Sequence, residues 1–419
     1  MRIKNIALFL IMGSVIFFAC SGDDDSSQNQ PQNQPPGNFN LIGVTNTANN
    51  VSVTPSFSWN ASVDPDGDEV VYDFYIGENE AASTLLLENL SETQITLEDR
   101  LKLLTQYYWR VVAKDGNGGE TSSETYNFTT RSLSSGTLLN TNGFSDLAAH
   151  TSLVFDDKIW TIGGLEYPPN IVEEIRFSTD GASWNIATSN PGFSKRFVHT
   201  SIVYDNKMWV IGGEDEFGNL LNDVWFSSDG TNWAEATSNA NFSIRKFHAS
   251  LVYDNKMWII GGDDGITLKN DVWYSTDGVN WVEATSAANF SERSALGSVV
   301  FDDKMWVIGG GGGGFFYNDV WYSTDGINWV EATPNANFSV RVGLTTVNYD
   351  NRMWLMGGFG ATINNDIWSS ENGSDWELVI EISNMSEVYA HSSNIFLNKI
   401  FVLGGDLGGV ASDEVWVFD

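Results

Sequence analysis

The stretch Tyr204-Asp-Asn-Lys-Met-Trp-Val-Ile-Gly-Gly213 decides the fold, because close copies of it recur along the second part of the chain. Its paired glycines fall at 163/164, 212/213, 261/262, 309/310, 357/358 and 404/405. The intervals between successive pairs are 49, 49, 48, 48 and 47 residues. A regular period of this length is the signature of repeated supersecondary units, so six units are predicted.

Each unit is predicted to be a four-stranded antiparallel sheet in which the quoted stretch is the second strand. A run such as Asn222-Asp-Val-Trp-Phe-Ser-Ser-Asp-Gly-Thr-Asn-Trp233 supplies the third strand and the turn into the fourth. Six such sheets arranged radially bury their faces against each other and leave only short edges. Residues 414–419 end the chain as a third strand, so the run 133–139 before the first unit is expected to complete the sixth sheet.

The period, the paired glycines and the aromatic residues of the third and fourth strands resemble kelch repeats of the galactose oxidase-like superfamily. The resemblance implies an all-β fold in which residues 133–419 form a six-bladed kelch-type β-propeller closed by an N-terminal strand. The Ser-Asp-Gly-Thr-Asn-Trp turn also resembles the Asp-box of sialidase-type propellers, but the paired glycines fit kelch better.

Residues 39–131 are predicted to form a small β-sandwich, because short alternating runs are separated by turn residues. The spacing of Trp59, Tyr72 and Tyr107 resembles that of fibronectin type III domains, with a tyrosine corner at Tyr107. We expect this domain to be a spacer or an auxiliary binding module.

The N-terminus is predicted to be an export signal. Arg2 and Lys4 precede an apolar stretch that ends at Ala19-Cys20. This resembles a bacterial lipobox, which implies a signal peptide at 1–19 and acylation of Cys20 by fatty acids such as palmitate. Residues 20–38 form an acidic, then Gln/Asn/Pro-rich tether, and Ser21-Gly-Asp-Asp-Asp25 resembles the export tag of surface lipoproteins. The expected location is the outer membrane, lipid-anchored and exposed at the cell surface.

Composition excludes several classes of function. The chain of 419 residues has 21 Lys and Arg against 54 Asp and Glu, a net charge of −33, which argues against binding to nucleic acid. A single Cys forbids an internal disulfide and a Cys-rich zinc site. No metal or cofactor is predicted, and the chain is expected to be a monomer.

The candidate ligand-binding residues lie on the connections that share one face of the propeller. The links between the fourth strand of one unit and the first strand of the next carry Arg196, Arg245, Arg293 and Arg341, with His199 and His248 three residues after the first two. Four guanidinium groups around a channel mouth would suit carboxylates, acidic or sulfated sugars or an acidic peptide. The alternative is structural, since residues repeated at one position often satisfy backbone groups or pack the junction between blades.

The loops between the second and third strands differ in every unit, and variable loops on a rigid scaffold commonly carry function. They supply the candidates Asp215, Phe217, Asp263 and Phe315. Aromatic rings beside carboxylates are typical of sugar sites.

Three classes of function remain open, one of which is a structural subunit of an envelope complex that takes no small ligand. The first of the other two is a surface-anchored binding or adhesion lipoprotein whose loops take a glycan or a protein. The second is a sugar-processing enzyme, because kelch propellers include sialic-acid epimerases and copper-radical oxidases. The oxidase chemistry requires a Cys–Tyr crosslink and is excluded, because the only Cys is Cys20. No acid–base pair stands out, which favours the binding protein.

Overall fold

The computed structural model describes residues 32–167 and 170–419, and these contain strands, turns and loops but no helix. The predicted all-β class is therefore confirmed. Within the same residues, no helical segment suited to crossing a bilayer is found. The predicted signal peptide and Cys20 lie outside the described residues. The chain forms two compact units, one containing residues 56–96 and 107–127 and the other containing residues 47–55, 97–106 and 128–419.

The N-terminal part contains the two sheets of a β-sandwich. The smaller sheet has the strand order β1 (Leu41–Gly43), β3 (Ser56–Trp59), β6 (Gln94–Thr96). The larger sheet has the order β2 (Ala48–Val51), β9 (Tyr126–Thr130), β7 (Gln106–Lys114), β4 (Val71–Gly77), β5 (Leu85–Leu90), with β8 (Glu120–Ser122) paired to β7. Aromatic rings fill the space between the sheets, because alternate residues of β3, β4 and β7 point inward. Phe57 lies 4.9 Å from Phe74 and 4.8 Å from Trp109.

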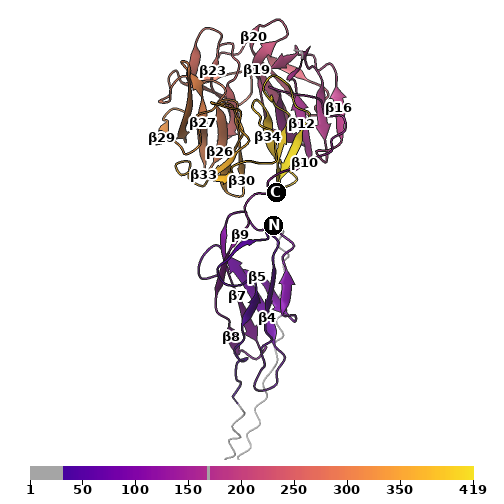
Figure 1. The fold of residues 1–419 in the computed structure, drawn as a ribbon, viewed down its shortest axis with the longest axis vertical. Coiled ribbons are helices and arrows are strands. Elements are labelled where there is room, and N and C mark those ends of the chain that lie inside the picture. The colour runs from indigo at the N-terminus through magenta and orange to yellow at the C-terminus, as the bar shows by residue number, and fades with distance from the viewer. Residues whose placement is uncertain (1–31, 168–169) are drawn as a thin grey trace, which may run out of the picture. The chain divides into compact units, whose positions relative to one another are not determined.

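Six antiparallel sheets form the blades of a propeller (Figure 1). We name the strands of each blade a to d from the channel outward. Blade 1 is β11 (Thr151–Phe155), β12 (Lys158–Ile162), β15 (Ile175–Ser178), β16 (Trp184–Thr188). Blade 2 is β18 (Thr200–Tyr204), β19 (Lys207–Asp215), β20 (Leu220–Ser227), β21 (Ala234–Thr237), with β17 (Arg196–Phe197) paired to β19. Blade 3 is β22 (Ala249–Tyr253), β23 (Lys256–Asp263), β24 (Leu268–Ser275), β25 (Val282–Thr285).

The remaining three blades follow the same plan. Blade 4 is β26 (Gly297–Phe301), β27 (Lys304–Gly312), β28 (Phe315–Ser323), β29 (Val330–Thr333). Blade 5 is β30 (Thr345–Tyr349), β31 (Arg352–Met356), β32 (Ile367–Ser370), β33 (Glu377–Ile380). Blade 6 is β34 (Ser392–Phe396), β35 (Lys399–Leu403), β36 (Val415–Phe418) and β10 (Thr137–Leu138). A short pair, β13 (Leu165–Glu166) and β14 (Asn170–Ile171), lies in the b–c connection of blade 1.

The ring closes between the two ends of the propeller sequence. The a strands follow one another from β11 through β18, β22, β26 and β30 to β34, which contacts β11. In blade 6 the d strand is β10, from the N-terminal side, where Thr137 pairs with Val417 and Leu138 pairs with Trp416 of β36. Each junction between blades is apolar: one cluster joins Trp258 and Ile260 of blade 3 to Met305, Val307 and Trp329 of blade 4.

The repeated turns explain why the sequence repeats so closely. Asp205 and Asn206 have φ values of 48° and 55°, as a two-residue type I′ hairpin requires, and the equivalent pairs do the same in the other blades. In the c–d turn, Asp229 accepts the N–H groups of Thr231 and Asn232. A side chain at Gly230 would come within 2.2 Å of Trp160 in the preceding blade. Only glycine fits this position, so the turn packs each blade against its neighbour.

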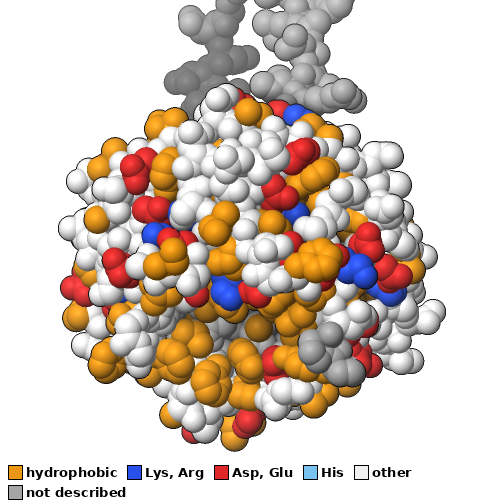
Figure 2. All heavy atoms as spheres, turned by 90° about the horizontal axis from the view of Figure 1, so that it is seen from above, with side chains coloured by type: hydrophobic (Ala, Val, Ile, Leu, Met, Phe, Trp, Pro, Cys, Tyr) orange, Lys and Arg blue, Asp and Glu red, His pale blue; other side chains and the backbone are white. Residues whose placement is uncertain are grey.

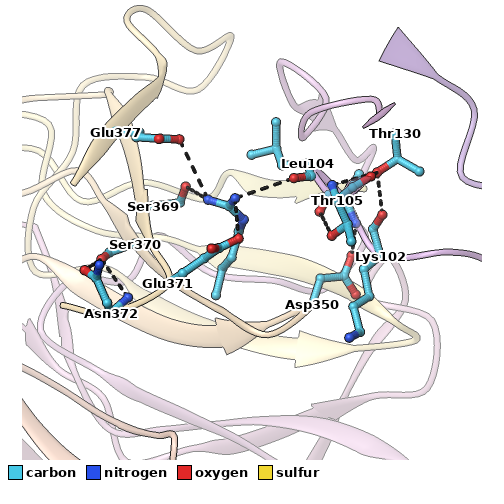
Figure 3. Close-up of polar contacts among 12 residues, drawn as sticks. Lys102, Leu104, Thr105, Thr130, Asp350, Ser369, Ser370, Glu371, Asn372 and Glu377 are labelled. Atoms are coloured by element: carbon cyan, nitrogen blue, oxygen red, sulfur yellow. Dashed lines mark hydrogen bonds and ion pairs between the residues drawn. The ribbon is translucent and has the colours of Figure 1, made fainter. Parts of the chain in front are cut away.

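Figure 3 shows polar contacts within the second unit, made by residues 102–105, Thr130 and Arg352 of blade 5. Thr130 Oγ1 accepts the N–H of Thr105 at 3.0 Å and donates to the carbonyl of Lys102 at 2.6 Å. Arg352 occupies the place of the lysine that follows the a–b turn in the other blades, and it donates to Glu371 at 2.6 Å. It thereby ties β31 to the c–d turn of its own blade.

Candidate functional site

The four repeated arginines are buried inside the blades. The side chains of Arg196, Arg245, Arg293 and Arg341 are 0% exposed. Each forms two hydrogen bonds of 2.6–2.9 Å to one aspartate at the start of its c strand, and the four partners are Asp223, Asp271, Asp319 and Asp366. The same aspartates accept the indole N–H of Trp225, Trp273, Trp321 and Trp368 at 2.7–2.8 Å.

Each arginine also joins the paired glycines of two neighbouring blades. Arg245 Nη1 donates to the carbonyl of Gly261 at 2.9 Å, while its own carbonyl accepts the N–H of Gly213 from the preceding blade at 3.0 Å. Its guanidinium carbon lies 5.6 Å from the Phe242 ring centroid. All the strong interactions of a guanidinium group are thus made inside the protein. The prediction that these arginines present charge to a ligand is therefore wrong, and the structural alternative accounts for their repetition.

His199 and His248 do reach the central channel, but they are part of its wall. They belong to a collar with His150 and His391, all at most 5% exposed. Each Nε2 is hydrogen-bonded to a hydroxyl on the a strand of the preceding blade: His199 to Thr151 at 3.0 Å and His248 to Thr200 at 2.8 Å. His150 meets Ser392 and His391 meets Thr345, both at 2.8 Å. Leu296 and Leu344 occupy the same position in blades 4 and 5.

Burial keeps this collar uncharged. It lowers the pKa of His150 to about 4. Burial, and then the charge of Arg245, lower the pKa of His248 to about 3, and burial lowers that of His391 to about 3. The same causes, with Arg196 as the neighbour, place the pKa of His199 well below its usual value. Neutral imidazoles in this position are not attractive partners for an anion.

A ring of six backbone hydrogen bonds encircles the channel mouth. Its members are Ala149, Val198, Phe247, Ala295, Gly343 and Ala390, one before each a strand. Each N–H donates to the carbonyl of the member in the preceding blade at 2.8–3.0 Å, and Ala149 closes the cycle by donating to Ala390. All six have φ between 48° and 61°, which turns the peptide groups along the ring. The ring and the collar beneath it line a cavity of about 310 Å³ with a predominantly apolar wall.

The four loop candidates are spread over three blades. Asp215 is buried and accepts the N–H groups of Phe217 and Asn219, so it braces its own loop. Asp263 is partly buried and accepts the N–H of Gly265. The predicted ligand role of these two carboxylates has no support, because the observed bonds are those of tight turns. Phe217 and Phe315 are 80% and 72% exposed at the tips of two separate b–c hairpins.

A cluster of polar side chains at the mouth comes from blades 6 and 1. Tyr389 lines the mouth cavity, and its hydroxyl donates to Asp406 Oδ2 at 3.0 Å. Tyr167 donates to the same oxygen at 2.8 Å. The other oxygen, Oδ1, accepts the N–H groups of Gly408 and Gly409. Sequence reasoning missed Tyr389 and Asp406; the available signal was that both lie at positions that vary between blades, where blade 2 has Phe197 and Glu214 and blade 3 has Lys246 and Asp263.

These bonds determine the charge state of the cluster. Burial opposes ionisation of Asp406, but the N–H groups and the two phenols still hold its pKa below the usual value. Burial and then the bond to Asp406 raise the pKa of Tyr389 and of Tyr167 to about 12. The carboxylate is therefore charged and both phenols are protonated at neutral pH.

An aromatic arc, made of Phe316, Phe359 and Tyr389, extends from this cluster along the loop face. The Phe359 and Tyr389 ring centroids are 5.6 Å apart, and those of Phe316 and Phe359 are 5.9 Å apart. Phe316 and Phe359 are 37% and 36% exposed. Beside the arc, Gly311–Gly314 and Phe247 border a second hollow of about 470 Å³. The glycine run thus shapes a surface depression next to the mouth.

Comparisons with known proteins agree with this architecture. The solved structure of YjhT is 18% identical, covers 67% of this chain and 96% of that chain, and superposes with a TM-score of 0.55, which supports the fold alone. No curated protein matches the chain closely enough to count as a relative. The family model of the KLHDC2/KLHL20/DRC7 Kelch-repeats domain matches residues 149–358, half of the chain. The chain therefore belongs to the kelch-repeat family.

Proposed function

We propose that the chain is a surface-anchored binding protein whose propeller takes a ligand at the channel mouth. The observation that carries this proposal is the apolar cavity of about 310 Å³ inside the six-residue ring, with the aromatic arc at its border. A concave apolar site with a few polar groups is the usual form of a ligand site. The ligand class that suits it is a glycan, because aromatic rings and hydroxyl-binding groups occur side by side.

A sugar-processing enzyme is supported less well by the same residues. Acid–base catalysis needs a group that can exchange a proton with the substrate near neutral pH. The collar histidines have pKa values far below 7, and both carboxylate oxygens of Asp406 already accept hydrogen bonds from groups of the protein. The described titratable groups around the mouth therefore favour binding over proton transfer.

A plug at the mouth tests the proposal. Phe247 shows that the ring accepts a phenylalanine at a φ of 52°, so Ala390→Phe, at a φ of 50°, should fold while filling the cavity. The full-length chain and this variant would be applied to a glycan array and then titrated against the strongest binder. We expect Ala390→Phe to weaken binding about tenfold or more, because the plug removes the volume the ligand enters. Val279→Phe, in an exposed c–d turn, is the control and should bind normally.

The anchoring part of the proposal has its own test. Cells expressing the chain would be fed an alkyne fatty acid, and intact cells would be treated with protease. We expect label on the wild-type chain, none on Cys20→Ser, and degradation of the wild-type propeller without cell lysis. Label without degradation would support the anchor and contradict surface exposure.

A further inference from the structure

We propose that the channel mouth selects a neutral, hydroxyl-bearing pyranose and rejects sugars that carry a carboxylate or sulfate. This inference rests on the proposed function and specifies the ligand class of the same site. Three independent features carry it: the direction of the hydrogen bonds at Asp406, the aromatic arc, and the pairing of the cations near the mouth.

The two phenols at the mouth are committed as hydrogen-bond donors and remain available as acceptors. Asp406 is a carboxylate and can only accept, so both phenol protons point at it. Each phenol oxygen keeps lone pairs for a partner, and Tyr389 lines the cavity itself. Such an oxygen binds a ligand O–H or N–H group and repels a second carboxylate or a sulfate. The cluster of Tyr167, Tyr389 and Asp406 therefore favours a ligand that donates hydrogen bonds, such as the hydroxyl groups of a sugar.

The aromatic arc offers the apolar counterpart of these acceptors. The three rings form a continuous series, since Phe359 contacts both Phe316 and Tyr389. Leu296 and Leu344 extend this apolar side down the channel wall. A pyranose has one face of C–H groups and an edge of hydroxyls, so it can pack on the rings while its edge meets the phenol oxygens. The apolar and polar sides of the mouth match those two sides of a pyranose.

Positive charge is lacking where an acidic sugar would need it. Among the described residues that line the mouth cavity, none is a lysine or an arginine. Lys246, one residue before the ring member Phe247, is paired with Glu214 at 2.6 Å, and the four repeated arginines are 0% exposed. On the face drawn in Figure 2, acidic side chains lie beside the few Lys and Arg side chains. With a net charge of −33, the protein repels a free anion at this site.

The test compares matched neutral and acidic sugars on the full-length chain. The probes are glycosides of glucose and galactose and the corresponding uronic acids, immobilised on one array and titrated in solution. We expect the neutral member of each pair to bind about tenfold more tightly or better, because like charges at a binding site cost more than about 1.4 kcal/mol. Tighter binding of the uronic acids, or equal binding, would overturn the inference while leaving the proposed function intact. Binding by no glycan at all would overturn both.

Two substitutions test the direction of the hydrogen bonds. Tyr389→Phe removes one acceptor but keeps the ring, and Asp406→Asn replaces an acceptor oxygen with an amide N–H, so the phenol protons turn away from it. Each should weaken binding of the neutral glycoside roughly fivefold, the value of a lost hydrogen bond. Tyr253→Phe is the matched control, since that hydroxyl donates to the carbonyl of Asp303 in an a–b turn.

A second readout separates recognition from a merely structural role. If Tyr389 accepts a ligand hydroxyl, one deoxy analogue of the glycoside should bind wild type and Tyr389→Phe equally well. A uniform loss with every analogue, or a lowered thermal unfolding midpoint that accounts for the loss, would contradict the assignment. Phe359→Ala should weaken all neutral glycosides roughly fivefold or more, whereas Phe217→Ala on a separate hairpin should not.

Discussion

Blades 2 to 5 and blades 6 and 1 are built from one repeat but differ at the same two positions. Blades 2 to 5 carry a buried arginine clamped to an aspartate, as in Arg245 and Asp271. Leu147 and Val388 replace the arginine before blades 1 and 6, and Glu174 and Glu414 replace the aspartate. Glu414 still accepts the indole N–H of Trp416 at 2.8 Å, so the bond between the carboxylate and the indole is kept although the arginine is absent.

The difference separates scaffold from site. The polar atoms of the repeated residues, including all four arginines, form hydrogen bonds and ion pairs that stabilise the blades. Positions that vary between blades supply Phe359 in blade 5, Tyr389 and Asp406 in blade 6 and Tyr167 in blade 1, which meet at the mouth. In this propeller, repetition identifies structural residues, and the positions that vary between blades hold the candidate ligand contacts.

The largest effect is expected where the ring closes. Deleting residues 413–419 removes β36, exposes the edge of β35 and leaves β10 without its partner. Because all the blades share one closed ring, the propeller should lose its cooperative thermal transition rather than one blade. Deleting Gly313 and Gly314 from the tip of the β27–β28 hairpin, in a repeated blade, should leave that transition in place.

Removing the carboxylate from a buried arginine–aspartate pair should cause the next largest loss of folding stability. Asp271→Ala leaves Arg245 buried without its counter-charge, which costs about 3–5 kcal/mol in comparable buried pairs. Glu414→Ala in blade 6 leaves no buried arginine behind and should cost clearly less. Urea unfolding of both variants measures the two free energies, and equal values would remove the distinction drawn between the two groups of blades.

A smaller effect is expected at the glycine of the c–d turn. Gly278→Ala would place a methyl group 2.1 Å from the Trp209 ring at a φ of 76° and should cost about 3 kcal/mol. Gly409 in blade 6 has a φ of 102°, but no atom lies within 4 Å of the position that an alanine methyl group would take there. Its alanine variant should therefore cost only the backbone strain, about 1–2 kcal/mol. Thermal unfolding of the two variants compares packing with strain.

The smallest effect concerns pH. His150, His248 and His391 of the collar titrate near 3 to 4 in the folded protein and near 6.5 when unfolded, so the unfolded chain binds more protons in this interval. Their contribution to stability is complete above pH 6.5 and is lost as the pH falls toward 4. His248→Leu should fold, since Leu296 and Leu344 hold the same position, and it should remove about one proton from the pH dependence of unfolding. An unchanged slope would show that His248 is accessible and titrates normally.

The candidate site is only partly predictable from sequence. The loop face and its aromatic residues can be identified, because the b–c loops vary while the turns on the other side repeat. The four arginines led to a wrong prediction. Each lies three residues before a residue that lines the channel, but this spacing does not show that the arginine side chain points into its own blade. Asp271 and Arg245 are 26 residues apart, and only the strand register brings them within 2.8 Å.

The sequence by itself determined the architecture, because a period of 47–49 residues, paired glycines and type I′ turn residues are local signals that every blade repeats. The tertiary structure alone decided which polar groups remain available. Ring closure places blade 6 beside blade 1, and this brings Tyr167 to the same Asp406 oxygen as Tyr389, 239 and 17 residues away from it. The sequence shows which residues carry a charge, but the fold determines which partner lies beside each of them and therefore whether that charge is available to a ligand.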